Sequence, residues 1–250
     1  MEEINNPFRI SEINRTLMSR SLFEIFDNSI VKLKGEFRSV GKTPSILYFG
    51  LKCLNKNKEE ITSQQINRIN EPLLIKSIDV GNNTIILDNK PKNWINSEKP
   101  DDQRYRQYIG IYYDGNTEHL PDDLIISPAY NAIKDEKIQL NQPIPPDIVE
   151  KIIPLKTKVM NHYGSSTYDY SVAGGISVPT KWTPYFATYQ EYSNGNGDIR
   201  NKFRPTTKFI CPVLLCNYYQ KSEDNPILEI RNIEIKIKNN LGKDNFNNYY

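Results

Sequence analysis

Nucleophilic catalysis needs a serine or cysteine beside a histidine, and the chain offers two histidines, His119 and His162. His162 lies in residues 160–170 near Ser165 and Asp169, which together are the residue types of a hydrolase triad. These residues fall within one loop, without the strand-to-helix turn that exposes a nucleophilic serine. We therefore interpret His162 as a structural or exposed histidine, and a hydrolase is the weakest of three functional hypotheses.

Paired carboxylates cleave glycosidic bonds, and Asp114, Asp122 and Asp123 follow a pair of tyrosines. Asp-Gly and Pro-Asp-Asp are also common turn sequences, and we favour that interpretation. The sequence has no glycine-rich phosphate loop, no His-Glu-x-x-His motif and no cysteine pair at metal-binding spacing. We expect a protein that is not an enzyme and that binds no cofactor or metal.

Aromatic residues are frequent on the polar side of the expected strands and in polar loops. Aromatic rings stack on the apolar faces of sugars, and they also anchor protein interfaces. The candidate ligand-binding residues are these aromatics and one acidic neighbour: Trp94, Tyr112, Tyr113, Asp114, Tyr163, Tyr168 and Tyr170. The alternative is that half or more of the tyrosines pack within the sheets, as their β-propensity predicts.

Strand patterns dominate the elements that would carry these residues. In residues 31–37, Val31, Leu33 and Phe37 share one face, while residues 45–53 are apolar on both faces and suit a central strand. The further strand candidates are residues 21–27, 72–75, 77–80, 84–87, 107–113, 156–160, 182–192, 208–218 and 227–237.

Three local patterns interrupt these strands. The parity of the apolar residues changes near Arg231 and Asn232, which predicts a β-bulge. Residues 55–58 and 81–83 have turn compositions. Residues 143–153 hold the only helical pattern, with Pro145 and Pro146 at its start.

Composition bounds the fold and the compartment. The chain has 250 residues, of which 38% are hydrophobic and 25% charged, and its net charge of +2 is spread without a basic stripe, which argues against nucleic acid as a partner. We interpret Cys53, Cys211 and Cys216 as small core residues. The sequence has no signal-peptide pattern and no apolar run of about 20 residues, so we expect a soluble, intracellular protein without membrane insertion.

These signals predict an all-β fold, an antiparallel β-sandwich of the jelly-roll type with long loops and at most one short helix. The sandwich is expected to span residues 21–237. Residues 1–20 and 238–250 are polar and weakly patterned, so we expect an N-terminal arm and a C-terminal tail outside it.

Four segments resemble those of the galactose-binding-like β-sandwiches, which occur as carbohydrate-binding modules in bacterial glycosidases and surface proteins. They are residues 30–39, 45–58, 178–185 and 227–235. Their order matches over residues 21–237, and the resemblance implies a jelly-roll sandwich with a sugar ligand. The loops 90–103 and 120–153 are longer than in a minimal module. No acidic cluster has calcium-binding spacing, so no ion is predicted.

The leading hypothesis is a non-catalytic binding or structural module within a larger protein assembly. The alternative is a lectin-like, carbohydrate-binding module. The expected partners are accordingly protein subunits or a glycan.

Overall fold

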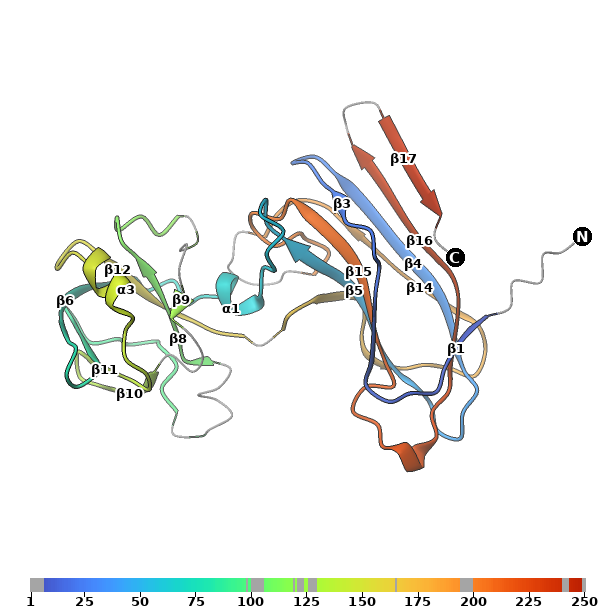
Figure 1. Cartoon of the computed structure of the whole chain (residues 1–250), viewed down its shortest axis with the longest axis horizontal. Coiled ribbons are helices and arrows are strands. Elements are labelled where there is room, and N and C mark those ends of the chain that lie inside the picture. The colour runs from blue at the N-terminus through green and yellow to red at the C-terminus, as the bar shows by residue number, and fades with distance from the viewer. Residues whose placement is uncertain are drawn as a thin grey trace, which may run out of the picture. The chain divides into compact units, whose positions relative to one another are not determined.

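The computed structural model describes residues 7–97, 99, 106–118, 120, 124–125, 130–164, 166–193, 200–239 and 243–248. Over these residues the chain is an antiparallel all-β protein with long loops, which confirms the predicted fold class. The contacts between residues within the chain group them into two compact units. The outer unit comprises Met1–Ile61, Thr167–Ser193 and Asp198–Tyr250, and the inserted unit comprises Thr62–Ser166. Figure 1 shows the elements of both.

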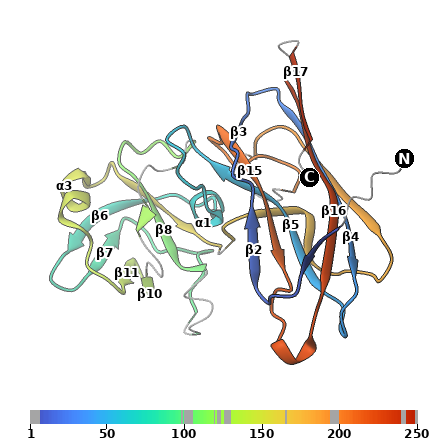
Figure 2. The same ribbon diagram turned by 45° about the vertical axis from the view of Figure 1, so that its right-hand side comes forward.

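Two sheets form the outer unit. Its strands are β1 (Phe8–Ile10), β2 (Arg15–Met18), β3 (Phe23–Glu24), β4 (Ile30–Ser39), β5 (Ile46–Leu54), β13 (Asp169–Ser177), β14 (Thr183–Tyr189), β15 (Phe209–Cys216), β16 (Leu228–Asn239) and β17 (Lys243–Asn248). One sheet has the order β1-β16-β4-β14, with β17 also on β16; the other has the order β13-β5-β15-β2, with β3 also on β15. Figure 2 shows the two layers.

The pairing of these strands follows a simple rule. β3 and β17 lie off the main path of the two sheets, and without them eight strands remain in chain order. The first pairs with the eighth (β1 and β16), the second with the seventh (β2 and β15), the third with the sixth (β4 and β14) and the fourth with the fifth (β5 and β13). The outer unit is therefore one long antiparallel hairpin folded over into two layers.

The core of the outer unit lies between the two sheets. Val31, Leu33 and Phe37 are fully buried on one side of β4, as the alternation predicted. β5 lies between β13 and β15, so it is a central strand of its sheet, as predicted. Leu47, Phe49 and Leu51 of β5 point into the same core.

A β-bulge interrupts β16, as predicted. The pairing with β4 shifts between Arg231 and Glu234, and Asn232 adopts φ 55°. The extra residue brings Ile230 before the bulge and Ile235 after it to the same buried side, although their positions differ in parity.

Segments expected to lie outside the sandwich contribute strands to its sheets. β1 and β2 belong to residues 1–20 and pair with β16 and β15, while β17 belongs to residues 238–250 and pairs with β16. These strands are short, and the first two bury few side chains, so their own patterns carry little strand signal. The neighbouring long strand supplies their hydrogen-bonding partners.

The inserted unit holds a seven-stranded antiparallel sheet in the order β10-β11-β7-β6-β12-β8-β9. Its strands are β6 (Leu73–Asp79), β7 (Thr84–Leu87), β8 (Tyr108–Tyr112), β9 (Leu124–Ile125), β10 (Tyr130–Lys134), β11 (Lys137–Leu140) and β12 (Lys158–His162). The two strands expected at 72–75 and 77–80 form one strand, β6, with a register shift between Ile75 and Ser77. The hairpin β10-β11 lies in the range expected to be a loop.

Two short helices belong to the inserted unit. The predicted helix is α3 (Pro146–Lys151), with a proline at its first position and Asp147 in its first turn. A second helix, α1 (Ser63–Ile66), was not predicted, since four residues carry no helical periodicity. The Gln65 side chain accepts the Thr62 N–H at 2.7 Å at its start. A 3₁₀ turn, Ser222–Asp224, lies in the outer unit.

Candidate binding surface

The outward face of the sheet β13-β5-β15-β2 carries an aromatic and a charged side chain from its central strand β5. Because Leu47, Phe49 and Leu51 point inward, Tyr48 and Lys52 point outward. Their partners on β15 are Leu215 and Cys211. Both partners are less than 7% exposed although they lie on this outward face.

Five tyrosines, Tyr48, Tyr168, Tyr170, Tyr218 and Tyr219, form what we term the tyrosine surface. Their ring centroids are 6.0 Å apart for Tyr168 and Tyr170, 5.0 Å for Tyr170 and Tyr48, 5.5 Å for Tyr48 and Tyr218, and 4.5 Å for Tyr218 and Tyr219. Each pair packs edge to face, the arrangement that the ring quadrupole favours. The rings thus form one continuous chain of contacts.

Two glycines make room for Tyr48 and Tyr170. A Cβ on Gly50 would collide with the carbonyl oxygen of Asp169, because β13 crosses close to β5 there. Gly175 has φ +74°, and a Cβ on it would lie 2.6 Å from the Tyr48 hydroxyl. The pairing of β13 with β5 shifts register twice, before Ala173 and after Gly174. Each shift is a β-bulge, so Gly174 and Gly175 belong to a bulged strand.

Tyr219 is the most exposed side chain of the tyrosine surface, at 81%. Its φ of 59° is left-handed, a conformation that costs energy for a bulky residue. Asn14 Oδ1 accepts the Tyr219 N–H at 2.9 Å, and the Asn217 side chain donates to the carbonyl of Glu12 at 3.0 Å. These hydrogen bonds to the segment before β2 hold the strained turn and display the ring to solvent.

Charge and protonation at the surface are fixed by its surroundings. Burial raises the pKa of Tyr48, Tyr168 and Tyr170, so their hydroxyls stay protonated at neutral pH and can both donate and accept. Lys52 Nζ lies 2.7 Å from Glu60 Oε2, and this hydrogen bond raises the pKa of Lys52. The surface therefore combines aromatic faces, hydroxyl groups and one ion pair.

No protein-family model, curated protein or solved structure matches the chain. The fold class therefore rests on the strand pairing alone. Among the described residues, no group of three or more His, Cys, Asp or Glu side chains is arranged to hold a metal ion. No helix within the same residues is long and apolar enough to cross a membrane.

Two of the predicted binding residues, Tyr168 and Tyr170, lie in the tyrosine surface. The other three members, Tyr48, Tyr218 and Tyr219, were not selected from the sequence. Tyr48 did carry a signal, because it alternates with the buried positions of β5. Tyr218 and Tyr219 follow β15, and nothing in their local pattern shows that they meet Tyr48.

The remaining predicted residues belong to the inserted unit. Trp94 is 6% exposed, belongs to the unit's core and donates from Nε1 to the Glu71 carbonyl at 3.2 Å. Tyr113 packs partly buried against that core. Asp114 Oδ1 accepts the Asn116 N–H at 2.9 Å, which is the turn chemistry of an aspartate. Tyr163 is half-buried. The burial of Trp94 differs from the expected loop exposure.

Tyr112 and His162 belong to a buried hydrogen-bond chain. Arg68 Nη1 donates to the Tyr112 hydroxyl at 2.7 Å, and the same hydroxyl lies 3.1 Å from His162 Nε2. His162 Nδ1 lies 2.9 Å from the Gln64 carbonyl, which can only accept, so Nδ1 carries the proton and Nε2 accepts from Tyr112. Burial lowers the pKa of His162 to about 4.

This network engages both ring nitrogens of His162, which is fully buried. Of its proposed triad partners, Asp169 belongs to the outer unit, where its Oδ1 accepts from the Ser171 N–H at 2.8 Å. Ser165 lies outside the described residues, as do His119, Asp122 and Asp123.

The three cysteines are buried, as predicted, at 1%, 3% and 0% exposure for Cys53, Cys211 and Cys216. Burial raises the pKa of all three thiols, that of Cys216 to about 12. They pack as small apolar side chains.

Proposed function

We propose that this chain is a non-catalytic binding module of a larger protein assembly, and that it contacts a protein partner through the tyrosine surface. The observation that carries the proposal is Tyr219, an aromatic side chain that is 81% exposed on a left-handed backbone. Strained backbone persists only where its surroundings hold it, and it concentrates at functional sites.

The energetics of association favour this use of Tyr219. Tyrosine is among the residues enriched at the energetic centres of protein interfaces, because its ring buries a large area with few rotatable bonds. The hydrogen bond that Asn14 Oδ1 accepts from the Tyr219 N–H and the one that the Asn217 side chain donates to the Glu12 carbonyl fix the backbone before any partner arrives. Less conformational entropy is then lost on binding.

The strand order supports a module of this kind. We take the pairing of eight strands, first with eighth, second with seventh, third with sixth and fourth with fifth, as support for a sandwich of the jelly-roll type. Jelly rolls build viral shells and also form lectins, so the fold agrees with an assembly subunit and with a sugar-binding module.

Carbohydrate binding is the second candidate function. The tyrosine surface favours it by offering ring faces for stacking together with protonated hydroxyls and the Lys52–Glu60 pair for hydrogen bonding. The galactose-binding-like resemblance of the strand segments points the same way.

A photo-cross-linking experiment distinguishes these functions. Tyr219 is replaced by p-benzoylphenylalanine in the full chain, and the cells that normally produce the protein are irradiated. A matched control places the same residue at Val80, which is 55% exposed in the inserted unit. We expect an adduct with a discrete protein from position 219 and none from position 80.

The outcomes separate the candidates. An adduct whose mass falls on glycosidase treatment supports carbohydrate binding. Equal adducts from both positions, or none from position 219, would refute binding at the tyrosine surface.

A further inference from the structure

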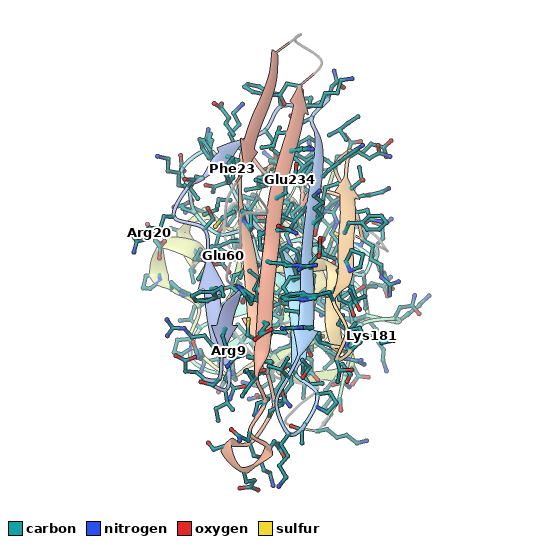
Figure 3. All side chains as sticks on the ribbon, turned by 90° about the vertical axis from the view of Figure 1, so that its right-hand side faces the viewer. Arg9, Arg20, Phe23, Glu60, Lys181 and Glu234 are labelled. Carbon is teal, nitrogen blue, oxygen red and sulfur yellow. The ribbon has the colours of Figure 1, made fainter. Side chains whose placement is uncertain are left out.

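The outer face of the other sheet, β1-β16-β4-β14, carries charged side chains in cross-strand pairs. Figure 3 looks onto this face, with Glu234 labelled on β16. Three successive pairs join opposite charges: Glu229 faces Arg38, Arg231 faces Glu36 and Glu234 faces Lys34. Their charged groups lie 2.6, 2.8 and 2.5 Å apart. Opposite charges placed this way stabilise a sheet.

The next pair breaks this pattern, because Lys236 faces Lys32. Like charges directly opposite each other destabilise a sheet. Lys236 Nζ lies 2.5 Å from Glu234, which already binds Lys34, so one carboxylate serves two ammonium groups. Lys32 is exposed and makes no ion pair with the described side chains. Among the described side chains at this place, the three lysines Lys32, Lys34 and Lys236 and the one glutamate, Glu234, sum to a charge of +2.

A hollow of about 290 Å³ lies at the same place. Its lining includes Lys32, Lys34 and Lys236 together with Phe186, which is 74% exposed on β14. Phe186 faces Lys34, so the ring and the ammonium groups border one hollow. We term Lys32, Lys34, Lys236 and Phe186 the lysine corner.

We propose that the lysine corner docks an acidic segment of a protein partner, with carboxylates at the ammonium groups and an apolar side chain against Phe186. The positive charge that an acidic segment would complement comes from the pair Lys32 and Lys236. Repulsion within this pair lowers the stability of the sheet while no partner is bound. The aromatic ring adds a contact that a purely ionic site lacks.

The surroundings favour a polypeptide over a nucleic acid. Glu234 stands within the corner, and the partly exposed Glu36 stands on the adjoining pair. A phosphate backbone would meet these carboxylates along its path, whereas a protein segment can place its own cations there. This docking site is independent of the tyrosine surface, which lies on the outer face of the opposite sheet.

The test uses the full chain and a short fluorescein-labelled peptide of alternating glutamate and leucine. Binding is followed by fluorescence anisotropy at low ionic strength, with a lysine-leucine peptide and a single-stranded oligonucleotide as competing probes. We expect saturable binding of the acidic peptide, weakened about tenfold or more by Lys32→Glu and by Phe186→Ser. The matched control, Lys42→Glu, changes an exposed lysine elsewhere in the outer unit and is expected to leave affinity unchanged.

Thermal unfolding gives an independent readout. Lys32→Glu converts the like-charged pair into an opposite-charged one, so its melting temperature is expected to rise by about 1–3 °C while its affinity falls. The proposal is overturned if the acidic peptide does not saturate, if Lys42→Glu weakens binding as much as Lys32→Glu, or if the oligonucleotide binds more tightly.

Discussion

Replacing Gly175 by alanine is expected to disturb the bulge of β13 that accommodates Tyr48. The backbone φ of +74° costs a residue with a Cβ about 1–2 kcal/mol. The new methyl group would also lie 2.6 Å from the Tyr48 hydroxyl, and moving that ring adds about 1 kcal/mol or more. The expected loss of unfolding free energy is therefore about 2–3 kcal/mol.

Urea denaturation of the outer unit measures this loss. Trp182 belongs to the outer unit and Trp94 to the inserted one, so Trp182 fluorescence in a Trp94→Phe background reports the outer unit. With a urea dependence of about 2–3 kcal/mol/M, the midpoint is expected to fall by about 1 M.

Gly174→Ala is the matched control, because a Cβ at this neighbouring position makes only an ordinary contact at 3.7 Å with the Tyr170 carbonyl. We expect its midpoint to stay within about 0.3 M of the unchanged protein, since such a glycine replacement alters stability by under about 1 kcal/mol. Equal midpoints for the two alanine variants would refute the bulge as the element that positions Tyr48.

Three further changes test other parts of the structure. Burial lowers the pKa of His162 to about 4 in the folded protein, whereas the same imidazole has a pKa near 6.5 in the unfolded chain. The free energy of unfolding is therefore expected to fall by about 3 kcal/mol as the pH drops from 6.5 to 4, and urea titrations of His162→Gln should lack this slope. Gly110→Ala places a Cβ against the His162 ring and is expected to cost about 1–3 kcal/mol in thermal unfolding, unlike Gly81→Ala. Glu229→Gln is expected to lower the free energy of unfolding in urea by about 1–2 kcal/mol, because the buried Glu229 carboxylate binds two arginines, each at 2.6 Å. The control, Glu223→Gln, removes an exposed ion pair and is expected to change this free energy little.

Local patterns in the sequence predicted those elements whose signal is local. The alternation of Val31, Leu33 and Phe37 identified a half-buried strand, and the double-sided apolar run of β5 identified a central one. The bulge near Asn232 was predictable because a strand that changes parity can keep one face buried only by inserting an extra residue.

Elements that depend on distant partners were not predictable. β1, β2 and β17 form because β16 and β15 offer unpaired edges, and their own residues do not show this. The hairpin β10-β11 lies in a range expected to be a loop, and its short strands belong to a sheet whose order the sequence did not reveal. The division into two units likewise depends on which strands meet.

For the same reason, only two of the five members of the tyrosine surface could be predicted from the sequence. Tyr168 and Tyr170 are close in sequence and could be chosen as polar-side aromatics. Their neighbour Tyr48 is more than a hundred residues away, and only the pairing of β13 with β5 brings the three rings together. The exposure of Tyr219 depends on a hydrogen bond to Asn14, from the opposite end of the chain.

Hydroxyl-radical footprinting of the native assembly tests the binding surface most directly. Oxidation rates of individual side chains are compared by mass spectrometry between the assembly and the isolated chain. We predict that Tyr219 is protected severalfold in the assembly, while Leu155, which is 62% exposed in the inserted unit, keeps its rate. Equal oxidation of Tyr219 in both samples would contradict binding through the tyrosine surface.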